Sequence, residues 1–470
     1  VPCEAEAPGQ GRLFRYPDGY RWVWPWGRVL HFDADGRLVR IGPVDGSEAE
    51  SVLIVRDAAG RIVQVTDPAG RRMTLEYSAD GHLVAVAHPL GTWHYRIDAA
   101  GRLRSVQGPE GVVRRYEYED IGYPSRLSSI TVAAGREPAR EIGRWSYDAE
   151  GRVAAYRRAD GTELRMSYVQ GDGSEDPRAQ AAPHTVVSVL ANALGARTTY
   201  TAVEIAGKWR VTEIRGPGCA ECGPTNVRMR YDARGQLVAR WRIDGDGVEY
   251  RRDASGRIVQ VLAVRGFDRP PRSTRPLRRF EYADGHGGWP SVIARPSVVP
   301  GEEHRVIVRR DARGQPVEVI REGFEPGPEP SPEARPGSAP AAGTAGSARA
   351  IRRTVRLHHE TIGGRRLLVA VDGPLPNGPA ASPSDSDVIR FSHDSNGLLA
   401  AVSMPGGVER RYLERDDAGR ALLVETTDGH RMVQWRIGRD AAGRRTSLSV
   451  TAWRLDAQGR LEASSRLARR

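Results

Sequence analysis

The chain is poor in several residue types that other folds depend on. Its 470 residues include one lysine, Lys208, and three cysteines, Cys3, Cys219 and Cys222. Three cysteines are too few for a disulfide framework in a chain of this length. No run of about 18 apolar residues occurs, so we expect no membrane span. Long stretches with the 3.6-residue period of helices are also missing, which argues against a helical protein.

Motifs that carry catalysis are absent as well. The sequence contains no Gly-x-Ser-x-Gly, no His-Glu-x-x-His and no Walker loop. Its histidines are scattered, and no nucleophile motif lies near His88, His94 or the pair His358-His359. Short acidic segments around Asp172 and Asp244 lack the glutamate that completes a calcium loop, so we interpret them as solvated turns. The sequence therefore predicts a protein that is not an enzyme and needs no cofactor or metal.

Because lysine is almost absent, nearly all the basic charge is arginine. The net charge is +11 and the pI is about 9.9, values that normally suggest a nucleic-acid partner. The arginines are spread along the whole chain, however, and a regularly placed aspartate accompanies them. A GC-rich coding background also explains arginine in place of lysine. We therefore expect no nucleic-acid partner, and an anionic protein or glycan surface fits the same charge.

One phrase recurs along the chain: Asp-x-x-Gly, followed in most copies by arginine and then by an aliphatic residue. Its twelve copies begin at Asp33, Asp57, Asp67, Asp98, Asp148, Asp232, Asp253, Asp311, Asp394, Asp416, Asp440 and Asp456. An aspartate that begins a turn accepts hydrogen bonds from the backbone two residues on, and glycine at the fourth position adopts the positive φ that closes a bulged hairpin. Each copy therefore predicts a hairpin turn.

The segments between these turns alternate as strands do. From Trp93 to Tyr118, for example, Tyr116 and Tyr118 share one face while Arg115 and Glu117 share the other. A large aliphatic residue stands two positions after the glycine in eight copies: Leu38, Ile62, Leu103, Val153, Leu237, Ile258, Leu399 and Leu461. A unit of roughly 20 residues cannot bury its own apolar face and must stack on its neighbours. We predict an all-β fold, an antiparallel hairpin meander that coils into a partial or complete β-shell.

The repeat resembles that of the Rhs/YD-repeat family. The matching motif, Tyr-Asp-x-x-Gly-Arg, is seen as Tyr147-Asp148-Ala-Glu-Gly151-Arg152 and, with glutamine last, from Tyr231 to Gln236. The resemblance covers most of residues 28–320 and 388–462. The family includes polymorphic toxin shells, cocoon components of insecticidal toxin complexes and animal teneurins, so the resemblance implies a hollow β-shell. Its aspartyl autoprotease has no recognisable counterpart here, because Asp67-Pro-Ala-Gly70 is an ordinary repeat turn.

Composition divides the chain into four parts. Residues 1–27 are predicted to form an aromatic N-terminal cap, and residues 28–321 a first repeat block. Residues 322–349 are rich in Pro, Gly and Ala, which is typical of an exposed linker. Residues 350–470 are predicted to form a second repeat block.

Two groups of residues are candidate sites. Tyr20, Trp22, Trp24 and Trp26 alternate along one strand and are predicted to face one way. They form either a stacking platform for sugars or a plug over the open end of the sheet. Cys219 and Cys222 lie in a loop and are predicted to form a small disulfide ring, with half a zinc site and unpaired thiols as alternatives. Cys3 has no evident partner.

These observations lead to one main hypothesis of function. We expect a non-catalytic β-scaffold that encloses or docks a partner protein, as part of a secreted toxin or surface assembly. The alternative is a carbohydrate- or cell-surface-binding module that uses the tryptophan strand. Either role places the chain outside the bacterial cytoplasm: secreted, periplasmic or at the cell surface.

Overall fold

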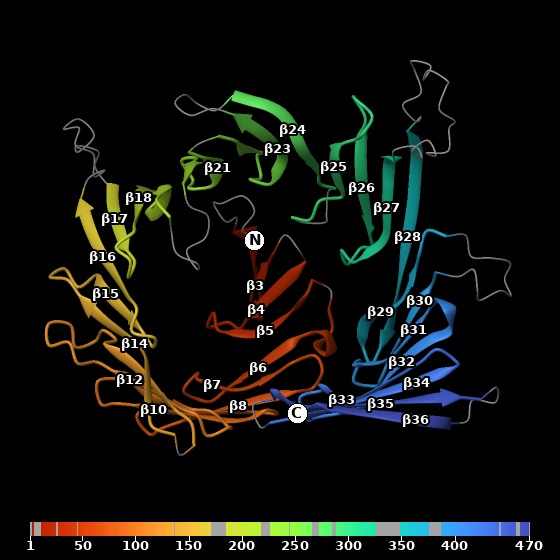
Figure 1. Cartoon of the computed structure of the whole chain (residues 1–470), viewed down its shortest axis with the longest axis horizontal. Coiled ribbons are helices and arrows are strands. Elements are labelled where there is room, and N and C mark those ends of the chain that lie inside the picture. Colours follow the sequence, from red (N-terminus) through yellow and green to blue (C-terminus); the bar gives the residue numbers. More distant parts are fainter. Residues whose placement is uncertain are drawn as a thin grey trace, which may run out of the picture.

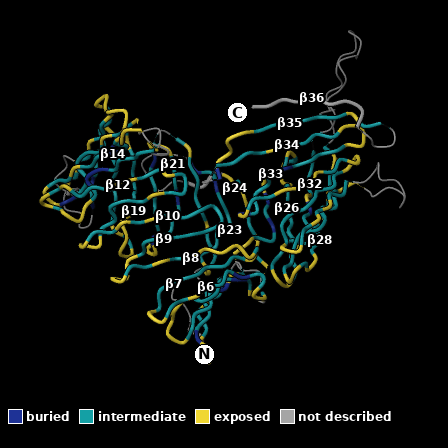
Figure 2. The backbone as a smooth tube through the Cα atoms, turned by 90° about the horizontal axis from the view of Figure 1, so that it is seen from below, coloured by how far each residue is buried: buried dark blue, intermediate teal, exposed yellow. Residues whose placement is uncertain are grey.

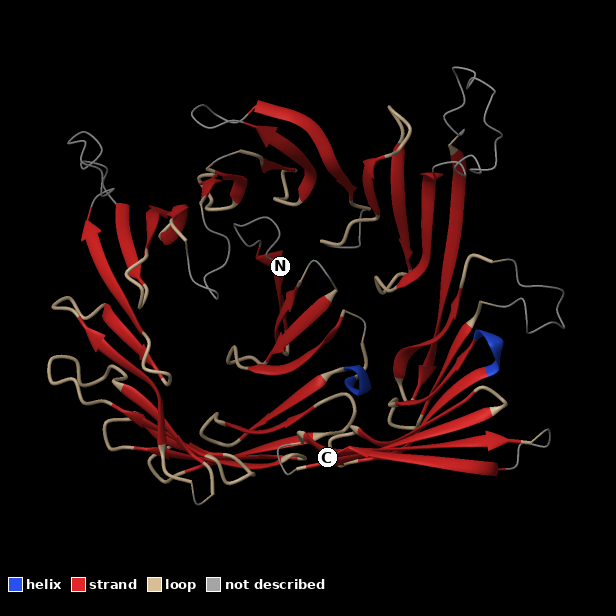
Figure 3. Ribbon diagram, in the orientation of Figure 1, coloured by secondary structure: helices blue, strands red, loops and turns tan. Residues whose placement is uncertain are grey.

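The computed structural model describes most of the chain as β-strands. It describes residues 2–3, 11–24, 27–44, 46–135, 137–170, 185–217, 226–243, 245–265, 272–283, 288–325, 348–375, 387–440, 443–456 and 461–469. Within these ranges the helical segments are two short 3-10 turns, η1 (Glu48–Glu50) and η3 (Pro405–Gly407) (Figure 3). No helix in the described ranges has the length and apolar character to cross a membrane.

The strands follow one another along the whole chain. The first nine are β1 (Pro2–Cys3), β2 (Arg12–Tyr16), β3 (Gly19–Val23), β4 (Arg28–Phe32), β5 (Leu38–Pro43), β6 (Val52–Arg56), β7 (Ile62–Thr66), β8 (Arg72–Tyr77) and β9 (Leu83–His88). The next nine are β10 (Gly91–Ile97), β11 (Leu103–Gln107), β12 (Val113–Glu117), β13 (Ser129–Ala133), β14 (Arg140–Tyr147), β15 (Val153–Arg158), β16 (Glu163–Gln170), β17 (Thr185–Ala191) and β18 (Arg197–Ile205).

The second half continues in the same way. It contains β19 (Lys208–Arg215), β20 (Val227–Tyr231), β21 (Leu237–Arg242), β22 (Gly247–Arg252), β23 (Ile258–Arg265), β24 (Arg272–Glu281), β25 (Val292–Pro296), β26 (Glu303–Arg310) and β27 (Pro316–Glu325). The last nine are β28 (Arg349–Ile362), β29 (Arg365–Asp372), β30 (Ile389–His393), β31 (Leu399–Met404), β32 (Val408–Arg415), β33 (Ala421–Thr427), β34 (Arg431–Arg439), β35 (Arg445–Leu455) and β36 (Leu461–Arg469).

All of these strands belong to one antiparallel sheet in which each strand pairs with the next. In β10 and β11, for example, His94 lies opposite Gln107 and Ile97 opposite Leu103, with a register shift just before the turn. Such a shift is the mark of a β-bulge. The predicted all-β hairpin meander is confirmed.

The Asp-x-x-Gly phrase forms the predicted turn. Gly101 has a φ of 76°, and its backbone N–H donates to the carbonyl of Asp98 at 2.9 Å. The Asp98 carboxylate accepts hydrogen bonds from the backbone N–H groups of Ala100 and Arg102, at 3.0 and 2.9 Å. The glycines of the other copies also have positive φ, except Gly459, which lies outside the described residues.

In several repeats a tyrosine joins the turn to the next repeat through a hydrogen bond that we call the clasp, which the sequence did not show. The Arg102 guanidinium pairs with Asp98 at 2.9 Å and lies 5.1 Å from the ring centre of Tyr118. The Tyr118 hydroxyl donates to the carbonyl of Leu103 at 3.0 Å. Tyr77, Tyr168 and Tyr282 donate in the same way to Ile62, Val153 and Ile258. The aliphatic residues two positions after the turn glycine thus accept these hydrogen bonds through their backbone carbonyls. Where they are described, their side chains are half-buried.

Arginine takes the place of this tyrosine in other repeats. Arg252 donates to the carbonyl of Leu237 at 3.2 Å and to Gly256 at 3.0 Å, and Arg415 donates to Leu399 and Gly419. In these two cases the preceding turn carries Gln236 or Leu398 where the tyrosine-clasped turns carry arginine. Arg56 donates to Leu38 in the same way at 3.3 Å although its preceding turn carries Arg37, so the turn arginine alone does not decide which of the two side chains is used.

The sheet is wound on itself. In Figure 1, β3 to β5 lie in the middle of the view, and later strands surround them: β10 to β18 on the left, β21 to β24 at the top and β25 to β28 on the right. The bottom of this view is formed by β8 and β10 toward the left and by β33 to β36 toward the right. Figure 2, turned by 90°, places the N-terminus and β6 and β7 at one end of the winding. No ladder joins the two ends of the described sheet, so the shell is not closed.

A single wound layer leaves the protein with a thin core. The fully buried apolar residues are few and mostly small, among them Val29, Ala239, Val264, Ala294 and Ile320. Most strand residues are half-buried (Figure 2). No second layer covers the sheet in the described structure, so both of its faces remain accessible.

The predicted linker of residues 322–349 lies mostly outside the described residues. Its first four residues, Glu322 to Glu325, belong to β27, and Arg349 begins β28. These two strands pair directly, with Glu325 opposite Arg349. Both predicted repeat blocks therefore contribute to the same sheet, and the four-part division stays a prediction.

The tyrosine clasp can be tested at Tyr118. Tyr118→Phe removes the hydroxyl and leaves the Leu103 carbonyl without this donor, so we expect a loss of about 1 kcal/mol of local stability. Hydrogen exchange of β10 to β12 measures it. Tyr116→Phe is the matched control, since no hydrogen bond of its hydroxyl occurs among the described residues. Equal effects of the two substitutions would contradict the clasp.

Candidate functional site

The tryptophan strand lies in β3 and the residue that follows it. Tyr20 lies opposite Arg15 of β2 and Phe32 of β4, and Trp22 lies opposite Leu13 and Leu30. The ring centres of Trp22 and Trp24 are 5.8 Å apart at an angle of 59°, so these two rings lie on the same side of the strand. Trp26 lies outside the described residues.

These rings are half-buried rather than open. The indole nitrogen Nε1 of Trp22 is buried without a hydrogen-bond partner. A Cβ atom at Gly11 would stand 2.7 Å from this nitrogen, because the start of β2 packs against the indole. The strand also lies toward one end of the winding (Figures 1 and 2). This position suits the plug, although both the plug and the sugar platform stay predictions.

Trp24→Ala separates the two interpretations. A sugar platform requires the Trp24 face, so the substitution should abolish any shift of tryptophan fluorescence on adding insoluble cell-wall glycans. A plug predicts no shift in the native protein and a less stable β2 to β4 unit in the variant. Trp209→Ala, which removes an exposed tryptophan of β19, is the control for non-specific quenching.

Cys219 and Cys222 lie outside the described residues, in the segment between β19 and β20. The two ends of this segment are tied together by Asn226. Its side-chain oxygen accepts from the Gly216 N–H at 3.0 Å, and its side-chain nitrogen donates to the Gly216 carbonyl at 3.2 Å. Gly216 and Asn226, on either side of the cysteine segment, are thus held together, and the predicted disulfide stays a prediction.

A thiol titration tests the predicted disulfide. If Cys219 and Cys222 are bridged, reduction should release about two more titratable thiols per chain than the non-reduced protein shows, because each bridge yields two. Cys219→Ser should remove that increase and expose the Cys222 thiol. An unchanged count after reduction would mean that the two thiols are free or bound to metal.

The winding brings early and late turns together along a line that we call the seam. On its early side lie Ser47, Glu50, Pro68 and Arg71, and on its late side lie Arg313, Gly364, Arg365, Arg366 and Ala418. Arg71 donates to the Ala418 carbonyl at 3.0 Å, Arg365 donates to the Pro68 carbonyl at 2.8 Å, and the Ser47 hydroxyl donates to the Gly364 carbonyl at 3.0 Å. These partners are 297 to 347 residues apart in sequence.

Glu50 is the centre of the seam. Its carboxylate accepts from the Arg313 guanidinium at 3.0 Å and from the backbone N–H of Arg366 at 3.0 Å. The side chain of Glu50 is only 13% exposed, and that of Arg313 is 32% exposed. A shielded pair of this kind contributes more than an open surface ion pair. The described strands on the two sides form no ladder with each other, so a small number of side chains hold the seam.

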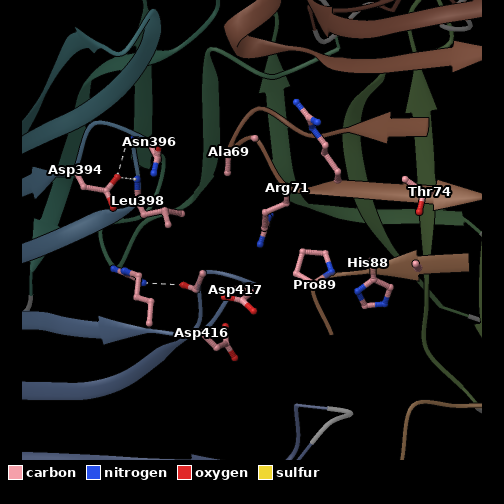
Figure 4. A pocket seen from close by; sticks show the side chains of 15 residues that line it. Ala69, Arg71, Thr74, His88, Pro89, Asp394, Asn396, Leu398, Asp416 and Asp417 are labelled. Atoms are coloured by element: carbon pink, nitrogen blue, oxygen red, sulfur yellow. Dashed lines mark hydrogen bonds between the residues drawn. The ribbon is translucent and has the colours of Figure 1, made fainter. Parts of the chain in front are cut away.

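A groove of about 670 Å³ opens along the seam (Figure 4). Its early wall includes Arg71, Arg72 and His88, and its late wall includes Asp394, Asp416 and Asp417. Most of these groups already serve the turns. Asp394 accepts from the N–H groups of its own turn. Burial raises the pKa of Asp416, but hydrogen bonds from Arg420 outweigh this effect and lower it. The described residues contain no cluster of His, Cys, Asp and Glu suited to a metal ion. The groove suits contact with another surface.

The sequence signals for the seam were weak. Arg71 and Arg313 belong to ordinary repeat turns, and Glu50, Arg365 and Arg366 lie outside any motif. The one local hint is the break in the repeat at η1, where the Glu50 carboxylate also accepts from the Ser47 N–H at 3.3 Å in a capping box. Neither Tyr20, Trp22 nor Trp24 lines the groove.

Comparison with known proteins identifies the repeat. Residues 56–92, from the end of β6 to the start of β10, match the RHS repeat family. Double-stranded DNA deaminase toxin A of Burkholderia cenocepacia (strain H111) is 24% identical to the chain over 486 aligned positions. The alignment covers 98% of this chain and 29% of the relative, so the chain spans less than a third of that toxin.

Similar solved structures are also long chains. The crystal structure of TcdB2-TccC3 aligns with a TM-score of 0.44 and 12% identity, over 97% of this chain and 28% of that one. The Tc holotoxin pore of Photorhabdus luminescens aligns with a TM-score of 0.45 and 12% identity, over 97% of this chain and 27% of that one. These scores are too low for the winding or the contacts of either structure to be transferred to this chain.

Proposed function

Because the chain belongs to the RHS repeat family, we propose that it is a non-catalytic β-scaffold that encloses or docks a partner protein. The observation that carries this proposal is the wound single layer. Most residues of the described strands are half-buried, and no second layer covers the sheet in the described ranges. Contact of a partner with the sheet would remove apolar side chains from water, among them Val55, Val169, Trp209 and Leu413, each about half exposed.

The seam supports enclosure more than simple docking. It joins turns that are hundreds of residues apart, so it stabilises the curvature of the sheet instead of the individual hairpins. A partner held inside the winding would leave only through the open ends or through the seam. Because side chains and no ladder hold the seam in the described structure, its opening costs less than the separation of two paired strands.

The similarity to a toxin bears on where such a scaffold would act. The relative named above is a toxin, and this chain aligns with less than a third of it. We propose that the scaffold belongs to a bacterial toxin assembly and acts outside the cytoplasm, in a secreted, periplasmic or surface-exposed location. The charged groups of the groove are mostly engaged in their own turns, which supports a role without catalysis.

Protease protection tests the proposal. The chain is co-expressed with the polypeptide encoded beside it, purified through a tag, and treated with a protease. Enclosure predicts that this polypeptide co-purifies in stoichiometric amount and resists digestion while bound. Glu50→Ala, which removes the central seam contacts, should leave the polypeptide bound but make it digestible several times faster.

Arg165→Ala is the matched control, because it removes an exposed ion pair with Glu163 far from the seam. It should leave protection unchanged. A polypeptide that binds but is digested as fast as when free would indicate docking without enclosure. Recovery on insoluble glycan with no protein partner would contradict the scaffold and favour the carbohydrate-binding alternative.

A further inference from the structure

Several hydrogen bonds that cross the seam end on backbone carbonyl groups. Arg71 donates to the carbonyl of Ala418, and Arg365 donates to that of Pro68. Every hairpin turn of the repeat presents such carbonyls, and the turns along one side of the sheet recur every two strands, about 10 Å apart. These bonds would therefore form equally well if one side of the seam were displaced by a repeat. They hold the seam without selecting which turns meet.

The ion pair between Glu50 and Arg313 depends on a side chain instead. The guanidinium donates to both carboxylate oxygens, at 3.0 and 3.3 Å, and Arg313 is the third residue of its Asp-x-x-Gly turn. In the copies of the phrase on the late side of the seam, the third residues are Arg313, Asn396, Ala418 and Ala442. Only the first of these carries a charge, so an ion pair with Glu50 distinguishes one late turn from the others.

Glu50 is held ready for this partner by its own segment. It belongs to the connection between β5 and β6, where its carboxylate also accepts from the backbone N–H of Ser47 at 3.3 Å. The hydroxyl of Ser51, a residue only 2% exposed, donates to the Ser47 carbonyl at 2.8 Å. From the late side, the backbone N–H of Arg366 donates to the same carboxylate at 3.0 Å. A carboxylate that is ordered in advance loses little conformational entropy when Arg313 pairs with it.

Ala418 adds a restriction of size. It is 8% exposed in the place where Arg71 meets its carbonyl. A displacement that brought Asn396 or Arg313 opposite Arg71 would put a larger third residue in this place. That residue would have to displace either the Arg71 side chain or its own neighbours. Charge at one late turn and small size at another thus favour the same alignment of the two sides.

We propose that Glu50 and Arg313 fix the register of the seam, so that they determine which late turn meets which early turn and how many strands complete one winding. Ala418 supports the same register. A displacement by one repeat would change the circumference of the winding by about 10 Å. The inference concerns the chain by itself and goes beyond the proposed enclosing function, since it names the residues that set the size of the winding.

Photo-crosslinking on the isolated chain reports the register. A photoreactive phenylalanine analogue is placed at Pro68, where a change of the exposed side chain leaves the contact intact because Arg365 bonds the backbone carbonyl. Mass spectrometry then identifies the residues to which the analogue is linked. In the native register it should link chiefly to Arg365 and to the turn between β28 and β29.

Arg313→Ala should release the register. Because backbone carbonyls remain available in every alignment, we expect the native link to fall several-fold and links to the neighbouring late turns, residues 311–315 and 394–398, to rise. Arg165→Ala, which removes an arginine away from the seam, is the matched control and should keep the native pattern. An unchanged pattern in Arg313→Ala would overturn the inference. Loss of the native link without new links would also overturn it, because the pair would then close the seam without selecting its register.

Arg313→Lys is the conservative variant, since it keeps a cation opposite Glu50, and it should retain the native photo-crosslink. The chain has a single lysine, Lys208. A carbodiimide, which joins an amine to a carboxylate in contact with it, should therefore link the introduced lysine to Glu50 in a product that is easily identified. Asn396→Lys, with Arg313 kept, places the amine at the same position of another turn and should give no product with Glu50. Such a product, or none for Arg313→Lys, would contradict the assigned pairing.

The two proposals fail separately. The crosslinks form on the isolated chain and involve no partner, so a register that does not depend on Arg313 overturns this inference and leaves the enclosing function standing. A register that depends on Arg313, in a chain that retains no partner polypeptide, overturns the enclosing function alone.

Discussion

The structure depends on the hairpin turn in which an aspartate carboxylate holds the backbone of an Asp-x-x-Gly segment. A single β-layer has almost no interior, so it cannot rely on a packed core to select its register. The carboxylate of Asp98 and the positive φ of Gly101 select it locally instead. Because the turn is repeated, each hairpin fixes the register of its own two strands. The hydrogen bond from Tyr118 to Leu103 then joins neighbouring repeats.

The composition has a physical explanation in this arrangement. Arginine at the end of the turn pairs with the aspartate and also lies over the tyrosine of the next clasp. Arginine before the turn replaces that tyrosine and reaches the same carbonyl. Lysine, with a single compact ammonium group, does not offer the planar fork that both positions use. The abundance of arginine is therefore consistent with the repeat as well as with a biased coding background, and needs no nucleic-acid partner.

The winding also brings distant repeats together at the seam, where the sheet is held less strongly than along its paired strands. Strand pairs hold the sheet along its whole length, whereas the seam is held by Glu50, Arg71, Arg365 and few other groups. Stability is therefore uneven, and local opening is expected where backbone ladders are absent. In the enclosing role that we propose, such a line would let the winding open while the hairpins stay folded.

The amino-acid sequence determined the strands, the turns and the all-β meander, because each of these depends on residues within one repeat. It also placed Tyr20, Trp22 and Trp24 on a shared strand, but their half-buried state depends on β2 and on the position of that strand in the winding. Only the tertiary structure decided that Glu50 meets Arg313 and that Arg71 meets the Ala418 carbonyl. Such contacts depend on the twist accumulated over more than twenty strands, and no local pattern of residues specifies that sum.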